Sequence, residues 1–272
     1  MKFELISNQE KALKRASGRN NRYEFHARKG STICYQQPLY EQPFPLLLEA
    51  IYKGNTLSKL KSRYYKIESN GGYIHQCYPA VEYYKIAHRM IRDNTHTIRF
   101  SLNEINKAQR AIEDIYTTSK EKLPGGQTKL SFDKEMYQLR SSIFTFVFSV
   151  RATLDTVASL FQTIYGPQIG QHISFNGFMK YITGNNSHIK DPVMCEFIRT
   201  KMEWFILLKD IRDYLAHFGS INFLIKEVEP GVLSIELFKD IEINNFIETV
   251  DNGFQELLMF LDGHCSSIID GG

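Results

Sequence analysis

The chain has 272 residues, of which 43% are hydrophobic and 23% are charged, and a chain of this size can bury a full apolar core in one or two domains. This composition excludes a disordered chain, a collagen-like repeat and a small fold held together by disulfides. The 33 Lys and Arg residues nearly balance the 30 Asp and Glu residues, so net charge alone does not indicate a nucleic-acid partner.

The cysteines and the apolar segments indicate a cellular compartment. None of the four cysteines forms a C-x-x-C pair, which argues against a zinc ribbon or a redox motif. The N-terminal segment lacks an apolar stretch suited to secretion, and the longest apolar run, residues 143–150, is far shorter than the roughly 20 residues of a membrane span. We therefore expect a cytoplasmic protein with reduced thiols and no membrane partner.

Charge is distributed unevenly along the chain. Residues 1–30 hold eight Lys or Arg against three Glu, and residues 227–262 hold nine Asp or Glu against Lys239 alone. Such blocks either form a surface that binds a polyanion or dock onto each other within one fold. The sequence leaves both alternatives open.

The basic N-terminal region, residues 1–125, is predicted to be rich in helix, with short hairpins, and to have an unassigned fold. The expected hairpins and helices follow from local alternation, turn residues and helical periodicity: hairpins over 23–36 and 64–77, and helices over 45–52, 80–92 and 102–120. The sequence Leu-Pro-Gly-Gly-Gln at 123–127 then interrupts the helical pattern. We place a domain boundary near residue 125.

The C-terminal domain, residues 126–272, has a stronger pattern. From Ile143 to Ile164 apolar residues recur at alternating steps of four and three, which predicts a helix over 132–165. Further predicted elements are helices over 176–183, 191–218 and 245–268 and a hairpin over 222–237. Asp191 and Gly219 are suited to cap the two ends of the 191–218 helix. The predicted fold is mainly α: an up-and-down helical bundle with a small β-hairpin insertion.

Three residues near the end of the 191–218 helix carry the clearest chemistry. Asp213 and His217 are four residues apart and share one face of the helix. A carboxylate in this position stabilises an imidazolium and orients the ring, and the permanently charged Arg212 is suited to hold phosphate oxygens. The alternative is an ordinary ion pair near a helix C-terminus, with Arg212 bridging to an acid on a neighbouring helix.

The segment Arg212-Asp213-Tyr214-Leu215-Ala216-His217 resembles the R-x4-H signature of HEPN domains, which are helical bundles of prokaryotic toxins, defence proteins and some eukaryotic ribonucleases. The resemblance covers about residues 130–268. It implies a metal-independent endoribonuclease in which two protomers bring both motifs to one cleft. In that reaction His217 would be the general acid or base, Arg212 would stabilise the charge on phosphorus, and Asp213 would orient or contact the substrate.

The resemblance also implies RNA and a second protomer as partners, with an antitoxin or another defence protein in a toxin or phage-defence context. Many HEPN-like domains serve as dimerisation or binding modules, so a non-catalytic module that binds RNA or a nucleotide is the alternative function.

Four further residues are candidates for substrate contact. Lys209 lies just before the motif and Tyr214 lies within it, while Arg151 and Asp155 lie one turn apart on the 132–165 helix. A solvated salt bridge is the alternative for the last pair. We expect no cofactor and no metal, because the histidines share no ligand spacing with Cys or carboxylates and no glycine-rich phosphate loop occurs.

Overall fold

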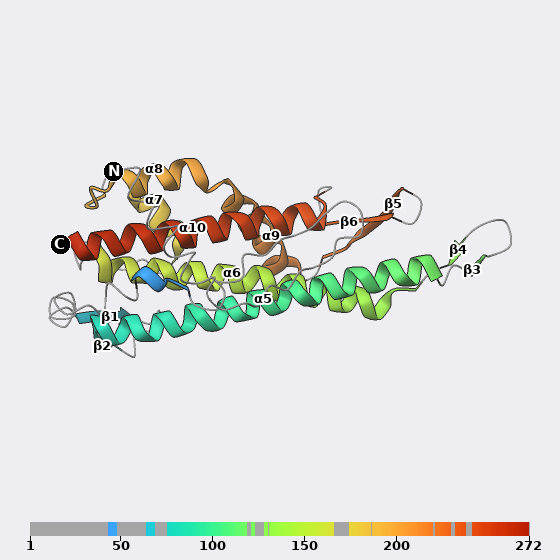
Figure 1. Cartoon of the computed structure of the whole chain (residues 1–272), viewed down its shortest axis with the longest axis horizontal. Coiled ribbons are helices and arrows are strands. Elements are labelled where there is room, and N and C mark those ends of the chain that lie inside the picture. The colour runs from blue at the N-terminus through green and yellow to red at the C-terminus, as the bar shows by residue number, and fades with distance from the viewer. Residues whose placement is uncertain are drawn as a thin grey trace.

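The computed structural model describes residues 43–47, 64–68, 75–118, 121–122, 128–129, 131–165, 174–185, 187–219, 221–229, 232–237 and 241–271. Its helices are α5 (Ala80–Thr118), α6 (Asp133–Tyr165), α7 (Phe175–Ile182), α8 (Pro192–Lys201), α9 (Glu203–Phe218) and α10 (Ile243–Gly271). The strands form three antiparallel pairs: β1 (Tyr64–Glu68) with β2 (His75–Pro79), β3 (Glu121–Lys122) with β4 (Thr128–Lys129), and β5 (Leu224–Glu229) with β6 (Val232–Glu236). The predicted mainly-α fold with a small hairpin is confirmed (Figure 1).

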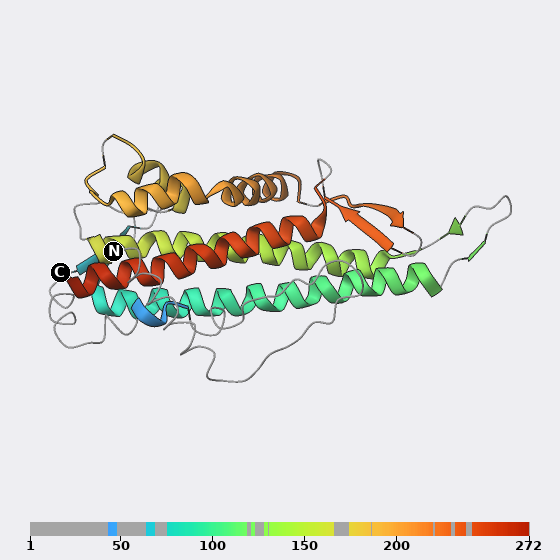
Figure 2. The ribbon, with the colours of Figure 1, turned by 45° about the horizontal axis from the view of Figure 1, so that its top comes forward.

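Three long helices, α5, α6 and α10, lie side by side along the long axis of the molecule (Figures 1 and 2). Helices α7 and α8 cover one end of this bundle, and α9 packs against both α6 and α10. The β5–β6 hairpin connects α9 to α10 near the opposite end. α6 is therefore the helix on which the other elements are arranged.

The predicted apolar periodicity of α6 faces the core. All seven of its residues are at most 8% exposed: Ile143, Val147, Val150, Leu154, Val157, Phe161 and Ile164. The corresponding residues of α9, Trp204, Leu208, Ile211 and Leu215, are buried as well. Burying each of these side chains contributes about 1.5–3 kcal/mol, so packing of these faces holds the bundle together.

The caps predicted for the 191–218 segment are confirmed, but the segment is two helices rather than one. Oδ1 of Asp191 accepts the Met194 N–H at 2.9 Å, and Gly219 ends α9 in the left-handed region with a φ of 70°. The helix breaks at Met202, whose φ is −110° and ψ is 19°. The break keeps exposed Lys201, which interrupts the apolar pattern, in solvent while α8 and α9 each bury their own apolar face.

The two helices predicted over 80–92 and 102–120 are one continuous helix, α5. The intervening residues include β-branched and short polar side chains, which have low helix propensity. Thr95 and Ile98 are nonetheless buried in the bundle, and the hydroxyls of Thr97 and Ser101 donate to the carbonyls of Asp93 and Thr97. Tertiary packing therefore decided the conformation of this segment.

Apolar residues from both sides of the predicted boundary near residue 125 belong to one hydrophobic core, because α5 packs along α6. The hairpin predicted over 64–77 is confirmed as β1–β2, with Lys66 paired to Cys77. The hairpin predicted over 23–36 lies outside the described residues, and of the helix predicted over 45–52 only 45–47 is described, as helix.

α6 is apolar along most of its length. Among the described residues, only Asp133–Phe161 of α6 is long and apolar enough to cross a membrane by length and composition, and 56% of its most apolar window is buried inside the bundle. The core helix of a soluble protein has the same properties, so this finding is compatible with a soluble protein.

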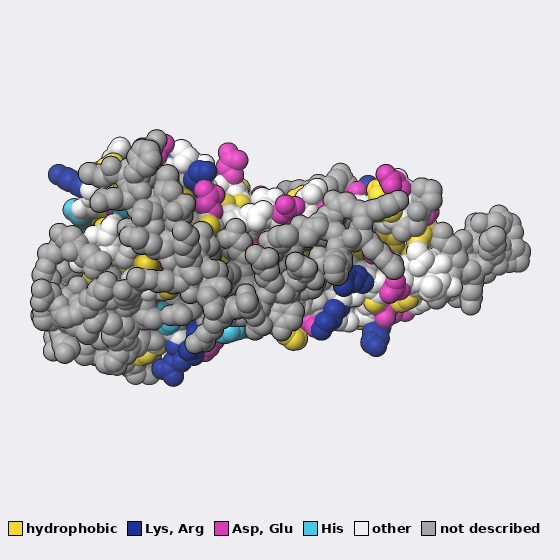
Figure 3. All heavy atoms as spheres, viewed as in Figure 1, with side chains coloured by type: hydrophobic (Ala, Val, Ile, Leu, Met, Phe, Trp, Pro, Cys, Tyr) yellow, Lys and Arg dark blue, Asp and Glu magenta, His cyan; other side chains and the backbone are white. Residues whose placement is uncertain are grey.

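Charged side chains of both signs are visible on the face shown in Figure 3. Lys and Arg side chains are more numerous along the α5 edge, where Asp and Glu side chains also occur. Two acids of the C-terminal block, Asp251 and Asp262, are buried and do not contribute to the surface. The net acidity counted along the sequence therefore overstates the negative charge that α10 presents to solvent.

Gly253 sets the distance between α10 and α9. A Cβ at this position would lie 2.6 Å from Nε1 of Trp204, so Gly253→Ala forces the buried indole to move. Overpacking of this kind costs about 1–3 kcal/mol, whereas the same change on an exposed helix face stabilises by about 1 kcal/mol. We expect chemical denaturation to show a lower free energy of unfolding for Gly253→Ala. Asn252→Ala, on the exposed side of α10, is the control and leaves stability nearly unchanged.

The buried carboxyl of Asp251 makes stability depend on pH. Burial raises its pKa from 3.8 to about 7, against a hydrogen bond from Nε2 of Gln255 at 2.7 Å that lowers it. Between these two pKa values the folded chain binds more protons than the unfolded chain, so the free energy of unfolding falls as pH rises from about 4 to about 7. Chemical denaturation at several pH values across this range is expected to show a weaker dependence of the free energy of unfolding on pH for Asp251→Asn. Glu248→Gln, on the exposed face of the same helix, is expected to leave this dependence unchanged.

Candidate functional site

The candidate residues of α9 lie in its last three turns. NH1 of Arg212 is 2.9 Å from Oδ1 of Asp213, and Nζ of Lys209 is 2.8 Å from Oδ2 of the same carboxylate. The hydrogen bond from Lys209, together with the positive charge of Arg212, lowers the pKa of Asp213 against a smaller effect of burial. Asp213 is therefore an ionised acceptor that holds two cationic side chains in place.

His217 is exposed in the last turn of α9, immediately before the Gly219 cap. Asp213 interacts electrostatically with His217, as expected for residues four apart on one face of a helix. The imidazole is thus both accessible to a substrate from solvent and close to a carboxylate.

Arg151 and Asp155 of α6 form the ion pair that their spacing predicts, with NH2 of Arg151 3.2 Å from Oδ1 of Asp155. The pair is not a solvated surface salt bridge, because Arg151 is only 8% exposed. Oδ1 of Asp155 also accepts the N–H of Phe175 at 2.9 Å, which is an otherwise unpaired donor of the first turn of α7. Burial raises the pKa of Asp155, while the Phe175 N–H and the guanidinium groups of Arg151 and Arg212 oppose that rise.

Two arginines, Arg151 from α6 and Arg212 from α9, bring incompletely paired donors to the same region. Among the described residues, Nε and NH1 of Arg151 and Nε of Arg212 are buried without a hydrogen-bond partner. The guanidinium of Arg151 lies over the Phe205 ring, 5.1 Å from its centroid. Burial lowers the pKa of Arg151, Asp155 opposes that effect, and Arg212 adds to it. A bound anion would satisfy these donors and offset the repulsion between the two guanidinium groups.

The structure therefore brings five of the seven predicted site residues into one electrostatic cluster between α6 and α9: Arg151, Asp155, Lys209, Arg212 and Asp213. His217 interacts with this cluster through Asp213. Tyr214 is half-buried and packs on Phe218, with ring centroids 4.8 Å apart. We name these five residues and His217 the α6–α9 cluster.

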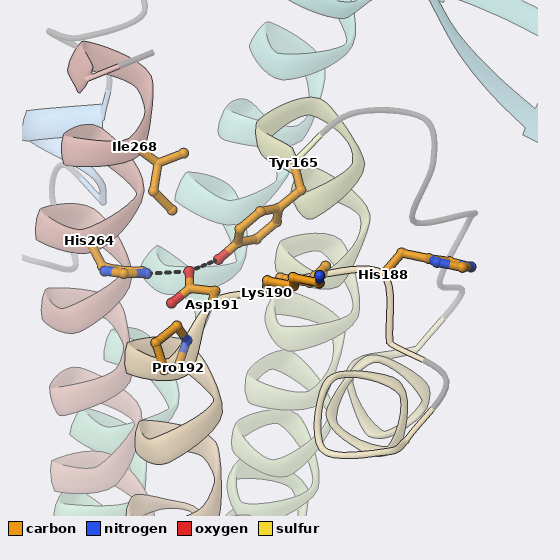
Figure 4. Close-up of a pocket in the computed structure, with 8 residues that line it drawn as sticks. Tyr165, His188, Lys190, Asp191, Pro192, His264 and Ile268 are labelled. Atoms are coloured by element: carbon orange, nitrogen blue, oxygen red, sulfur yellow. Dashed lines mark hydrogen bonds and ion pairs between the residues drawn. The ribbon is translucent and has the colours of Figure 1, made fainter.

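A second polar feature lies at the other end of α6, around Asp191. The Tyr165 hydroxyl donates to Oδ2 of Asp191 at 2.7 Å, and Nε2 of His264 lies 2.6 Å from the same oxygen. Figure 4 shows Tyr165 and His264 pointing at Asp191 from opposite sides, whereas His188 and Lys190 point away from it. Tyr165, Asp191 and His264 border a cavity of about 420 Å³.

The hydrogen bonds at Asp191 connect α6, the start of α8 and α10. Burial favours the protonated acid, but the hydrogen bonds from His264, the Met194 N–H and Tyr165 outweigh this effect and lower the pKa of Asp191. The polar groups in this feature are directed at one another, so its evident role is to hold three helices together. Sequence reasoning identified Asp191 only as a helix cap, because its partners are 26 and 73 residues away and have no local signal.

In the part of the chain that the structure describes, no group of three or more His, Cys, Asp or Glu side chains is placed to hold a metal ion. The residues of the α6–α9 cluster are instead suited to binding an anion and moving a proton.

Comparison of the chain with protein-family models, curated proteins and solved structures finds no match.

Removing Arg151 is predicted to cost less stability than removing Asp155. Arg151→Met removes two unpartnered buried donors and leaves Asp155 without its ion-pair partner but still bonded to the Phe175 N–H, so we expect only a small loss in the free energy of unfolding. Asp155→Ala leaves Arg151 without its counter-charge and the Phe175 N–H without an acceptor, which costs about 1–3 kcal/mol. Chemical denaturation of both variants checks this order, and a loss in Arg151→Met as large as in Asp155→Ala contradicts it.

Proposed function

We propose that this protein is a metal-independent endoribonuclease that cleaves RNA at the α6–α9 cluster. The observation that carries the proposal is the convergence of incompletely paired guanidinium donors from Arg151 and Arg212 beside an exposed imidazole, His217. Arginine donors of this kind suit the oxygens of a phosphodiester, and a histidine can transfer protons at neutral pH.

The chemistry uses the RNA itself as the nucleophile. The ribose 2′-hydroxyl loses its proton to a base and attacks the adjacent phosphorus. The P–O5′ bond then breaks as an acid donates a proton to the departing O5′, which leaves a 2′,3′-cyclic phosphate and a free 5′-hydroxyl. In our proposal His217 transfers one of these protons. Arg212 and Arg151 stabilise the negative charge that develops on the phosphate oxygens. Asp213 acts as a positioning residue, since it holds both Arg212 and Lys209.

A complete reaction requires one group to remove a proton and another to supply one. One motif offers a single His, so we propose that two copies of the chain pair and that each contributes His217 to a shared cleft. The resemblance to HEPN domains supports this arrangement, and it supports a cytoplasmic toxin or phage-defence role with a possible antitoxin or defence partner. The alternative function is a non-catalytic HEPN-like dimerisation module that binds RNA or a nucleotide, for which the anion-binding arginines alone suffice.

The proposal predicts RNA cleavage in excess EDTA and a loss of roughly 100-fold or more in rate for His217→Ala, the usual contribution of a general acid or base. Gel analysis of a labelled RNA measures the rate, and identification of 2′,3′-cyclic ends tests the chemistry. His217 is exposed, so its replacement is expected to leave the fold intact.

His96→Ala is the matched control, because His96 is an exposed histidine on α5. We expect this variant to retain full activity. The absence of cleavage by the unaltered protein, or equal rates for the two histidine variants, would overturn the ribonuclease proposal. Retained RNA binding without cleavage would favour the non-catalytic alternative.

A further inference from the structure

One face of α6 carries three aromatic side chains, of which two are exposed and the third, Phe148, is partly buried against the core. Tyr137 is 70% exposed and Phe144 is 41% exposed. Phe148, one turn further, is half-buried and stacks on Phe144 with ring centroids 4.3 Å apart. At helical spacing these three residues, which we name the aromatic stripe, share one face with Arg151 and Asp155.

Arginine side chains accompany the aromatic stripe along its length. The guanidinium of Arg140 lies 5.7 Å from the Tyr137 ring centroid and 5.9 Å from that of Phe223. Its Nε donates to the carbonyl of Ile221 at 3.0 Å, which fixes the side chain against the segment that follows α9. The guanidinium is thus held in place between two rings rather than extended into solvent.

The aromatic stripe leads to the α6–α9 cluster. Arg140 contacts Ile221, and Arg151 lies within electrostatic reach of Arg212, so α6 and α9 run in opposite directions past each other. Phe144 and Phe148 lie between Arg140 and Arg151 along α6, and therefore at the level of the last turns of α9. The stripe and the cluster therefore lie along one face of α6, on which the exposed rings precede the largely buried guanidinium of Arg151.

We propose that the aromatic stripe is a stacking surface for the bases of single-stranded RNA, and that it directs the phosphate backbone to Arg151 and Arg212. The inference rests on the proposed function and identifies its substrate as an unpaired strand. Single-strand-binding proteins combine aromatic rings, on which bases stack, with cationic groups that follow the backbone. Because every base presents a flat π-face, such a surface tolerates many sequences. A paired duplex does not expose its base faces, so it is a poor ligand for this surface.

The test measures binding separately from cleavage. The probe is a fluorescent 2′-O-methyl oligouridylate, because it lacks the 2′-hydroxyl required for cleavage. A second probe of the same length has abasic central positions, so that it keeps the backbone but lacks the bases that would stack. Anisotropy titrations are expected to show that Tyr137→Ala and Phe144→Ala each bind the base-containing probe about five- to tenfold more weakly. This loss of affinity is at the low end of the range for removal of one base–aromatic stacking contact. Binding of the abasic probe is expected to be unchanged by either substitution.

The control substitutions separate stacking from a general loss of apolar surface. Phe100→Ala removes a side chain that is 62% exposed on α5 and is expected to leave binding of both probes unchanged. Tyr137→Phe keeps the ring and is expected to retain binding. Equal losses for the two probes, or no loss for either alanine variant, would overturn the inference.

A second copy of the chain is the competing occupant of the stripe. Light scattering decides between the two: a dimer that becomes a monomer in Tyr137→Ala or Phe144→Ala assigns the stripe to an interface between copies and overturns the inference. Failure of the proposed function can be distinguished from failure of this inference. Base-dependent binding without any RNA cleavage would overturn the nuclease reaction and support the stacking surface. Cleavage without base-dependent binding would retain the nuclease reaction and overturn the stacking surface.

Discussion

The whole architecture depends on the packing of α6 at the centre of the bundle. Its inner face is buried against neighbouring helices, including α5, α9 and α10, and burial of these apolar side chains is the dominant contribution to stability. Its outer face carries Arg151, Asp155 and the aromatic stripe. The same rigid helix therefore holds the core and positions the candidate chemistry, so the spacing between the stripe and the α6–α9 cluster is set by helix geometry.

The α6–α9 cluster illustrates a separation between stability and function. Arg151 is buried with two unpartnered donors, and an incompletely satisfied buried charge is costly to the fold. Asp155, in contrast, stabilises both Arg151 and the first turn of α7. The feature around Asp191 is different again, because its donors and acceptors satisfy one another across three helices. The two regions therefore differ in that buried donors of the first lack partners, whereas the polar groups of the second satisfy one another.

Local pattern predicted most of the C-terminal helices because apolar periodicity there coincides with burial. Apolar periodicity identified the inner face of α6, and residue types suited to helix ends identified the Asp191 and Gly219 caps. Two errors came from treating local propensity as decisive: α5 continues through a segment of poor helix formers because Thr95 and Ile98 are buried, and the helix from Pro192 breaks at Met202. In both places long-range packing outweighed a weak local preference.

The sequence by itself determined the helical class, the ends of several helices and the ion pair between Arg151 and Asp155, which lie one turn apart. These are consequences of helical spacing, which is visible in any single segment. Only the tertiary structure decided that the α6 pair lies against the α9 motif, that Arg151 is buried with unpartnered donors, and that the aromatic stripe leads to them. Those facts depend on the antiparallel packing of α6 and α9, which no local spacing records.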